Sequence, residues 1–151
     1  IMKLFGTISN KSISIFGFAF KKNTNDTRES PSIKICKELL NEGANLLIYD
    51  PKVSDHQIES ILGKQHHISS LDDIYMLDEG SWNFSESISS AVNGSDAIVI
   101  LTEWQEFKNI DWEVVSATLR RPAWIFDARS TVNVEYLESL GLNVWRVGLG
   151  N

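Results

Sequence analysis

The stretch AIVIL at residues 97–101 is an uninterrupted apolar run of strand length. A strand that is apolar on both faces is typical of a parallel sheet covered by helices on either side. Thr102, with Gln105 three residues later, has the pattern of a capping box, so we expect a short helix through Trp104 and Phe107. The stretch therefore predicts a strand followed by a helix in a layered α/β fold.

Similar apolar segments lie on both sides of this run and alternate with helix patterns. The predicted strands are residues 12–16, 46–49, 97–101, 124–126 and 143–146. Besides the short helix above, the predicted helices run from the Ser30-Pro31 start to Leu40 and over residues 56–62, 85–92, 111–119 and 134–140. Residues 63–84 have a weak, polar pattern, so we expect a loop there with at most a short strand near His67-Ile68. The alternation predicts a Rossmann-like, doubly wound parallel sheet with right-handed crossovers.

Length and composition restrict the class of protein. The 151 residues suit one domain, and the formal net charge of −6 argues against sequence-independent binding of nucleic acid. No apolar run approaches the roughly 20 residues of a membrane span, and one cysteine cannot form an internal disulfide, so we expect a cytoplasmic protein. Because Ile1 precedes Met2, we expect a single domain of a longer protein, with residues 1–10 as the tail of a linker helix from an upstream domain and residues 11–151 as the domain.

Two cations come shortly after the ends of predicted strands. Lys21 follows the first strand, and Arg129 follows the strand at residues 124–126. Ligands of doubly wound sheets bind outside the carboxyl ends of the strands, so the two side chains could converge on one anion, such as a diphosphate. The alternative is that Lys21 and Lys22 are solvated loop charges and that Arg129 pairs with Asp127.

The first turn lacks the dinucleotide fingerprint. That fingerprint needs three glycines directly after the strand, whereas Gly17 is followed by Ala19 and Lys22 at the other two positions. The acidic residue Asp50 comes 33 residues after Gly17, instead of about 20. We therefore expect that this sheet does not hold NAD in the usual way.

Several segments resemble the UDP-binding domain of UDP-glucose/GDP-mannose dehydrogenases, over essentially the whole chain. The resembling segments are GFAFKKNTNDTRES at residues 17–30, YDPKV at 49–53, AIVILTEWQEF at 97–107, IFDAR at 125–129, and residues 141–148. The signature loop at residues 17–30 is specific to this family, and TEWQEF is most similar to the UDP-glucose branch.

The resemblance implies an activity for the full-length protein. It would be an NAD-dependent oxidoreductase that converts UDP-glucose to UDP-glucuronate in two hydride-transfer steps. NAD would be bound mainly by an N-terminal domain of the same chain. The catalytic cysteine would also lie upstream of residue 1, and the enzyme would be a homo-oligomer. This part of the chain would then have no catalytic residue and no activity alone.

The resemblance also assigns residues by motif. Phe20, Lys21 and Arg129 correspond to residues that contact the nucleotide sugar, and Arg28 to one that reaches NAD. We expect the neighbouring Asp26 and Glu29 to position Arg28 through charge-assisted hydrogen bonds.

Other reactive or aromatic residues have structural interpretations. Cys36 lies on an apolar helix face, where cysteine is usually buried. His56, His66 and His67 lack further ligands at metal-binding spacing, so we expect no metal site. The aromatic residues Trp104, Phe107 and Trp112 are expected in the core.

Three other functions remain open at this point. The chain could be a stand-alone UDP-sugar binding or regulatory module, or the equivalent domain of a UDP-N-acetylmannosamine or GDP-mannose dehydrogenase. A receiver-like signalling domain is less consistent, because it would need clustered acids after the first strand, where Lys21 and Lys22 stand.

Overall fold

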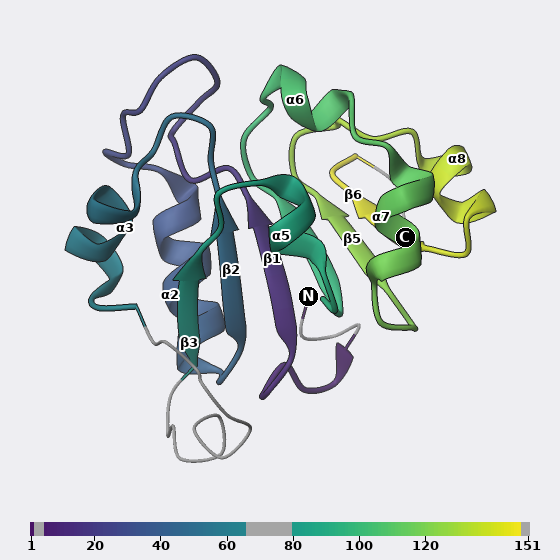
Figure 1. Cartoon of the computed structure of the whole chain (residues 1–151), viewed down its shortest axis with the longest axis horizontal. Helices are drawn as coiled ribbons and strands as arrows, with labels where there is room; N and C mark the ends of the chain where they lie inside the picture. Colours follow the sequence, from purple (N-terminus) through teal and green to yellow (C-terminus); the bar gives the residue numbers. More distant parts are fainter. Residues whose placement is uncertain (2–4, 66–79, 149–151) are drawn as a thin grey trace.

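A parallel six-stranded sheet forms the centre of the molecule (Figure 1). The computed structural model describes residues 1, 5–65 and 80–148. The strands are β1 (Ser12–Phe16), β2 (Asn45–Tyr49), β3 (Ser81–Phe84), β4 (Ala97–Ile100), β5 (Trp124–Asp127) and β6 (Asn143–Arg146). Their order is β3-β2-β1-β4-β5-β6, so the direction of winding reverses between β1 and β4. The predicted Rossmann-like sheet is confirmed.

Helices cover both faces of this sheet. They are α2 (Pro31–Asn41), α3 (Asp55–Leu62), α5 (Ile88–Val92), α6 (Gln105–Lys108), α7 (Trp112–Thr118) and α8 (Val134–Ser139). Right-handed crossovers place α2 and α3 on one face and α5, α7 and α8 on the other (Figure 1). The short α6 lies beyond the carboxyl end of β4, above the edge where all the strands finish.

The central strand β1 contains a polar residue whose bonds explain its burial. Ser14 is fully buried; its hydroxyl donates to Ala91 O (2.5 Å) in α5 and lies 2.6 Å from Ser95 Oγ. A buried hydroxyl needs such partners, and here they fix α5 against the sheet.

One strand was missing from the sequence prediction. Residues 81–84 were expected in a loop, but they form the edge strand β3, which pairs with β2 alone. Only Trp82 and Phe84 are apolar in this segment, and the Trp82 indole Nε1 donates to Gly63 O (3.0 Å). The expected short strand near His67-Ile68 lies outside the described residues.

The predicted capping role of Thr102 is wrong. Trp104 occupies the N-cap position of α6, without a side-chain cap. The Thr102 hydroxyl instead donates to Ala19 O (2.9 Å) in the loop after β1. The capping-box pattern fails here because the Thr102 hydroxyl bonds a distant segment of the chain instead of the first turn of α6.

The segment before β1 packs against the sheet. Ile8 is buried, and the Phe5 ring lies 6.1 Å from the Phe126 ring. Since residues 2–4 are outside the described part, the linker-helix assignment of residues 1–10 stays a prediction. Among the described helices, none has the length and apolar character to cross a membrane.

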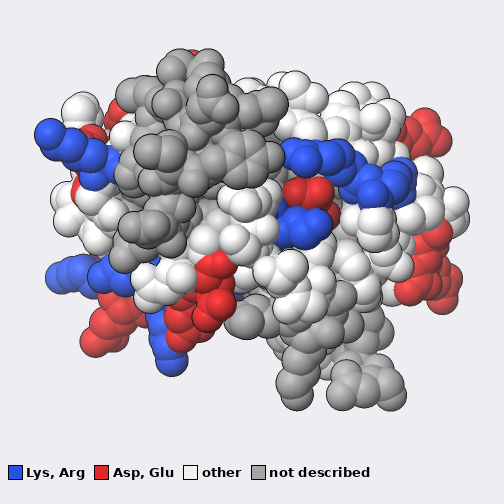
Figure 2. Space-filling model, turned by 90° about the horizontal axis from the view of Figure 1, so that it is seen from below, with Lys and Arg blue, Asp and Glu red and all other residues white. Residues whose placement is uncertain are grey.

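The edge at which the strands begin carries mixed charge. Figure 2 shows this edge, where basic side chains lie beside acidic ones. Arg120 Nε lies 3.8 Å from Asp96 Oδ1, and the other Asp96 oxygen accepts the Ser12 N–H (2.9 Å). Asp96 is thus used by a neighbouring arginine and by the main chain. The candidate site lies at the opposite edge, where the strands end.

Candidate functional site

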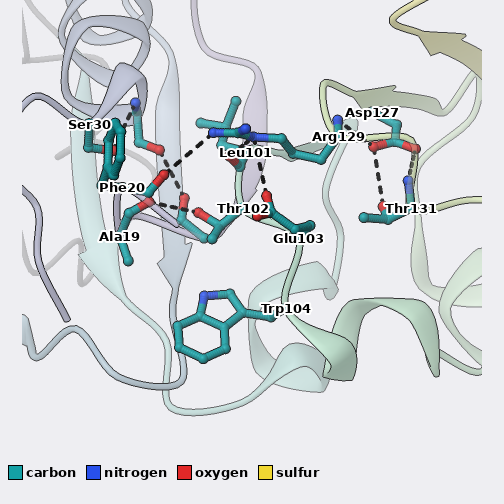
Figure 3. Close-up of polar contacts among 12 residues, drawn as sticks. Ala19, Phe20, Ser30, Leu101, Thr102, Glu103, Trp104, Asp127, Arg129 and Thr131 are labelled. Carbon is teal, nitrogen blue, oxygen red and sulfur yellow. Dashed lines mark hydrogen bonds and ion pairs between the residues drawn. The ribbon is translucent and has the colours of Figure 1, made fainter. Parts of the chain in front are cut away.

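Three loops meet where β1, β4 and β5 end. They are the segment from Gly17 to Lys21, the segment from Leu101 to Trp104, and the turn from Asp127 to Arg129. β1 and β5 are not neighbours, because β4 lies between them. Arg129 crosses this gap (Figure 3), and it brings the loops after β1 and β5 together.

The Arg129 guanidinium is held by two main-chain carbonyls. Its Nε donates to Leu101 O (2.9 Å), and its Nη2 lies at a longer 3.5 Å from Phe20 O. Its carboxylate neighbour is Glu103, whose Oε2 is 3.5 Å from Nε. That oxygen is buried without a hydrogen-bond partner, so Arg129 supplies the balancing charge. No described residue bonds Nη1, which leaves one edge of the guanidinium for a ligand.

The Asp127 carboxylate accepts hydrogen bonds from the main chain and none from the Arg129 guanidinium. Its carboxylate, fully buried, accepts N–H bonds from Arg129 (3.0 Å), Thr131 (2.6 Å) and Val132 (2.9 Å). The alternative in which the Arg129 side chain pairs with Asp127 is therefore wrong. The carboxylate fixes the turn from which Arg129 projects, and the cation stays accessible, with 34% of its side chain exposed.

Hydrogen bonds hold the loop after β1 at several points. Gly17 has a φ of 95°, and a Cβ at this position would lie 2.8 Å from Thr102 N. The Phe18 carbonyl accepts the Ser30 hydroxyl (2.9 Å), and Phe20 N donates to Asp26 O (2.7 Å). These bonds turn the Phe20 side chain outward, so that 43% of it is exposed.

The predicted site residues differ in how directly they meet. Phe20 and Arg129 are adjacent through the Phe20 carbonyl, and Lys21 is exposed one residue further along the loop. A common role of the three in binding a nucleotide sugar remains a prediction.

Arg28 forms the predicted ion pair with one of its two acidic neighbours. Its Nε and Nη2 donate to Asp26 Oδ1 (3.0 Å) and Oδ2 (2.9 Å), a two-pronged pair. Mainly through these side-chain bonds, the pKa of Asp26 is lowered to about 2, and the pKa of Arg28 is raised. Glu29 has a left-handed backbone conformation, with a φ of 57°. Its side chain makes no hydrogen bond among the described residues, so it does not bond Arg28 there.

Asp50 is a residue whose role the sequence pattern did not reveal. It lies at the end of β2, where dinucleotide-binding folds place the acid that binds a ribose. Here the side chain is only 3% exposed, and it accepts five N–H bonds from the chain itself. The Asp50 carboxylate is thus used by the chain's own N–H groups, unlike the acid that binds a ribose in dinucleotide-binding folds.

A hollow lies on the sheet face beside the site. It has a volume of about 560 Å³ and is lined mainly by apolar residues, among them Leu101, Ala128 and Trp145. It includes neither Phe20, Lys21 nor Arg129. Because an anionic ligand needs cations, the candidate site is placed at Arg129 and not in this hollow.

The sequence matches a known family over most of its length. Residues 14–134 match the model of the UDP-glucose/GDP-mannose dehydrogenase family, UDP binding domain. The chain belongs to this family. Its relatives in the family include the UDP-glucose 6-dehydrogenase of Drosophila melanogaster, 41% identical over 148 residues, and UDP-glucose 6-dehydrogenase 4 of Arabidopsis thaliana, 36% identical over 156 residues. Each alignment covers 98% of this chain but 30% and 32% of those proteins, so the chain spans about a third of their length.

Solved structures of two dehydrogenases have a similar fold. An NDP-N-acetyl-D-galactosaminuronic acid dehydrogenase from Methanosarcina mazei Go1 matches with a TM-score of 0.73 at 18% identity, over 97% of this chain and 26% of that one. A UDP-glucose dehydrogenase from Pyrobaculum islandicum matches with a TM-score of 0.65 at 19% identity, over 96% and 27%.

The other residues singled out in the sequence are a cysteine, three histidines and three large aromatic residues. Cys36 is buried as expected, and its burial raises the pKa of its thiol to about 12. The described residues contain no group of three or more His, Cys, Asp or Glu side chains placed to hold a metal; His66 and His67 lie outside them. Trp104, Phe107 and Trp112 are all buried, as predicted.

Proposed function

We propose that this chain is the UDP-sugar-binding domain of an NAD-dependent dehydrogenase that oxidises UDP-glucose to UDP-glucuronate in two hydride-transfer steps. Membership of the family supports the general role, and the relatives named UDP-glucose 6-dehydrogenase support the substrate. The observation that carries the proposal is the Arg129 guanidinium, held across the end of β4 with one edge lacking a partner among the described residues.

In this proposal the two cations bind the diphosphate. The guanidinium of Arg129 binds phosphate oxygens with its Nη groups, and the Lys21 ammonium adds a point charge from the loop after β1. The exposed Phe20 ring packs against the nucleotide sugar. Glu103 keeps the guanidinium oriented while the site is empty.

The cofactor belongs to another part of the enzyme in this proposal. NAD would accept the hydride, and an N-terminal domain of the same chain would hold it, because the Asp50 carboxylate is used by the chain's own N–H groups here. Arg28, whose side chain is 88% exposed, would contact the cofactor from outside the sheet. We propose a cytoplasmic homo-oligomer for the whole enzyme and no dehydrogenase activity for this domain alone.

Calorimetric titration of the 151-residue chain with UDP tests the site. We expect Arg129→Ala to weaken binding by roughly 1.5–3 kcal/mol, the scale of a hydrogen bond to a charged group. Lys34→Ala is the control, because this exposed lysine makes only a long ion pair with Glu38 in α2 (3.9 Å). Equal affinities of Arg129→Ala and the unsubstituted chain would rule out the assigned role. Titration with GDP separates the UDP-binding from the GDP-binding members of the family.

A further inference from the structure

The Asp50 carboxylate connects three separate segments of the chain. Its Oδ2 accepts the N–H groups of Phe18 (2.8 Å) and Ala19 (3.0 Å) and the indole Nε1–H of Trp104 (3.2 Å). Its Oδ1 accepts the N–H groups of Lys52 (2.8 Å) and Val53 (3.0 Å). One side chain thus holds the loop after β1, the turn after β2 and the segment that leads into α6.

Every donor to this carboxylate is a neutral N–H group. No lysine or arginine side chain of the described residues pairs with Asp50, so this carboxylate does not neutralise a cation of the proposed site. A buried carboxylate without cationic partners depends on such N–H bonds, and hydrogen bonds to a charged group are the stronger kind. The positions of these donors are therefore closely determined.

Two of the donors directly precede the proposed ligand contacts. The amides of Phe18 and Ala19 come immediately before Phe20 and Lys21 in the chain. The third donor, Trp104, directly follows Glu103, which lies against Arg129. The same oxygen atom, Asp50 Oδ2, therefore ties together the two segments that carry Phe20 and the neighbour of Arg129.

We propose that Asp50, with Trp104, is a positioning residue for the nucleotide site. It touches no ligand; it sets the direction in which Phe20 and Lys21 leave the sheet and keeps that loop against Arg129. This inference rests on the proposed function, because it assigns Asp50 a role in the same site.

The test compares two buried aspartates. Asp50→Asn replaces one acceptor oxygen by an amino group that faces N–H donors, so the UDP dissociation constant should rise about fivefold or more. Asp96→Asn is the matched control: Asp96 is 8% exposed, accepts the Ser12 N–H, and lies at the opposite edge of the sheet. Its dissociation constant should stay within about twofold of that of the unsubstituted chain, because distant sites act independently.

A milder variant keeps the test valid if Asp50→Asn does not fold. Trp104→Phe removes the indole N–H but keeps an aromatic ring, so we expect UDP binding to weaken by about two- to fivefold. Amide hydrogen exchange at Phe18 and Ala19 should become faster in both variants and stay unchanged in Asp96→Asn.

The outcomes separate the two proposals. If the unsubstituted chain does not bind UDP, the proposed function fails, while the exchange rates still test whether Asp50 holds the loop. If a folded Asp50→Asn chain binds UDP as tightly as the unsubstituted chain, the positioning role is overturned. If the Asp50→Asn chain does not fold, unchanged UDP affinity together with unchanged exchange in Trp104→Phe overturns the role equally.

Discussion

Gly17 allows the close approach of two loops at the carboxyl edge of the sheet. Its φ of 95° lies in the left-handed region, and Thr102 occupies the space that a side chain would need. Gly94 offers a comparison, because its φ of 73° is also positive but nothing lies within 4 Å of an added Cβ.

We therefore expect Gly17→Ala to lower the free energy of unfolding by more than about 2 kcal/mol, since it adds a steric clash to backbone strain. Gly94→Ala should lower it by about 1 kcal/mol, from strain alone. Urea unfolding measures both. Similar losses in the two variants would show that Thr102 moves aside without cost.

The ion pair of Asp26 with Arg28 can be tested by titrating the Asp26 carboxyl group. Asp26 has a pKa lowered to about 2 from an ordinary value of 3.8, so its contribution to stability is present above pH 4 and is lost as the pH falls toward 2. In Arg28→Ala, we expect the Asp26 pKa to return toward 3.8, because the side-chain bond from Arg28 is the main cause of the shift. Carboxyl NMR shifts follow this titration.

Lys21→Ala is the control for that titration, because Lys21 has the smallest of the effects on the Asp26 pKa. A pKa that stays near 2 without Arg28 would show that the pair does not exist in solution.

At the scale of helices and strands, one arginine connects two helix ends. The guanidinium of Arg121 donates to Gly141 O (2.7 Å) and Leu140 O (3.3 Å) after α8, and to Ser116 O (3.2 Å) in α7. Carbonyls at a helix end lack partners within the helix, and cations are favourable there.

We expect Arg121→Ala to reduce the free energy of unfolding by about 1–2 kcal/mol, because these carbonyls lose their donor. Arg121→Lys should restore only part of the loss, since an ammonium lacks the planar fork. Thermal unfolding followed by circular dichroism provides the measurement. A fully restored stability in Arg121→Lys would show that charge alone matters.

The strands differ in how well the sequence predicts them. β4 is a continuous apolar run and β1 has isoleucines at alternate positions, so these local patterns were sufficient to place both strands. β3 has four residues with polar positions, and its pairing with β2 comes from tertiary contact, which no local pattern encodes. The Thr102 pattern misled for the same reason, because its partner Ala19 lies 83 residues away.

For the whole molecule, the sheet order determines how much of the site was predictable. The positions of Lys21 and Arg129 after strand ends followed from the sequence, and so did the family. That Arg129 reaches across β4 could not be predicted, since the sequence does not show which strand separates the two loops. The hydrogen bonds of Asp50 could not be predicted from the sequence either, because the donors come from three separate segments and most of them are main-chain groups.

The bonds that Thr102, Ser30 and Asp50 make to the loop after β1 have a kinetic consequence. If a nucleotide binds at this loop as proposed, the part held by these bonds would need little rearrangement, so the association rate would depend mainly on encounter and orientation. Complexes with different nucleotides would then form at similar rates, because each nucleotide meets the same protein groups in the same positions. Their affinities would differ mainly through their dissociation rates.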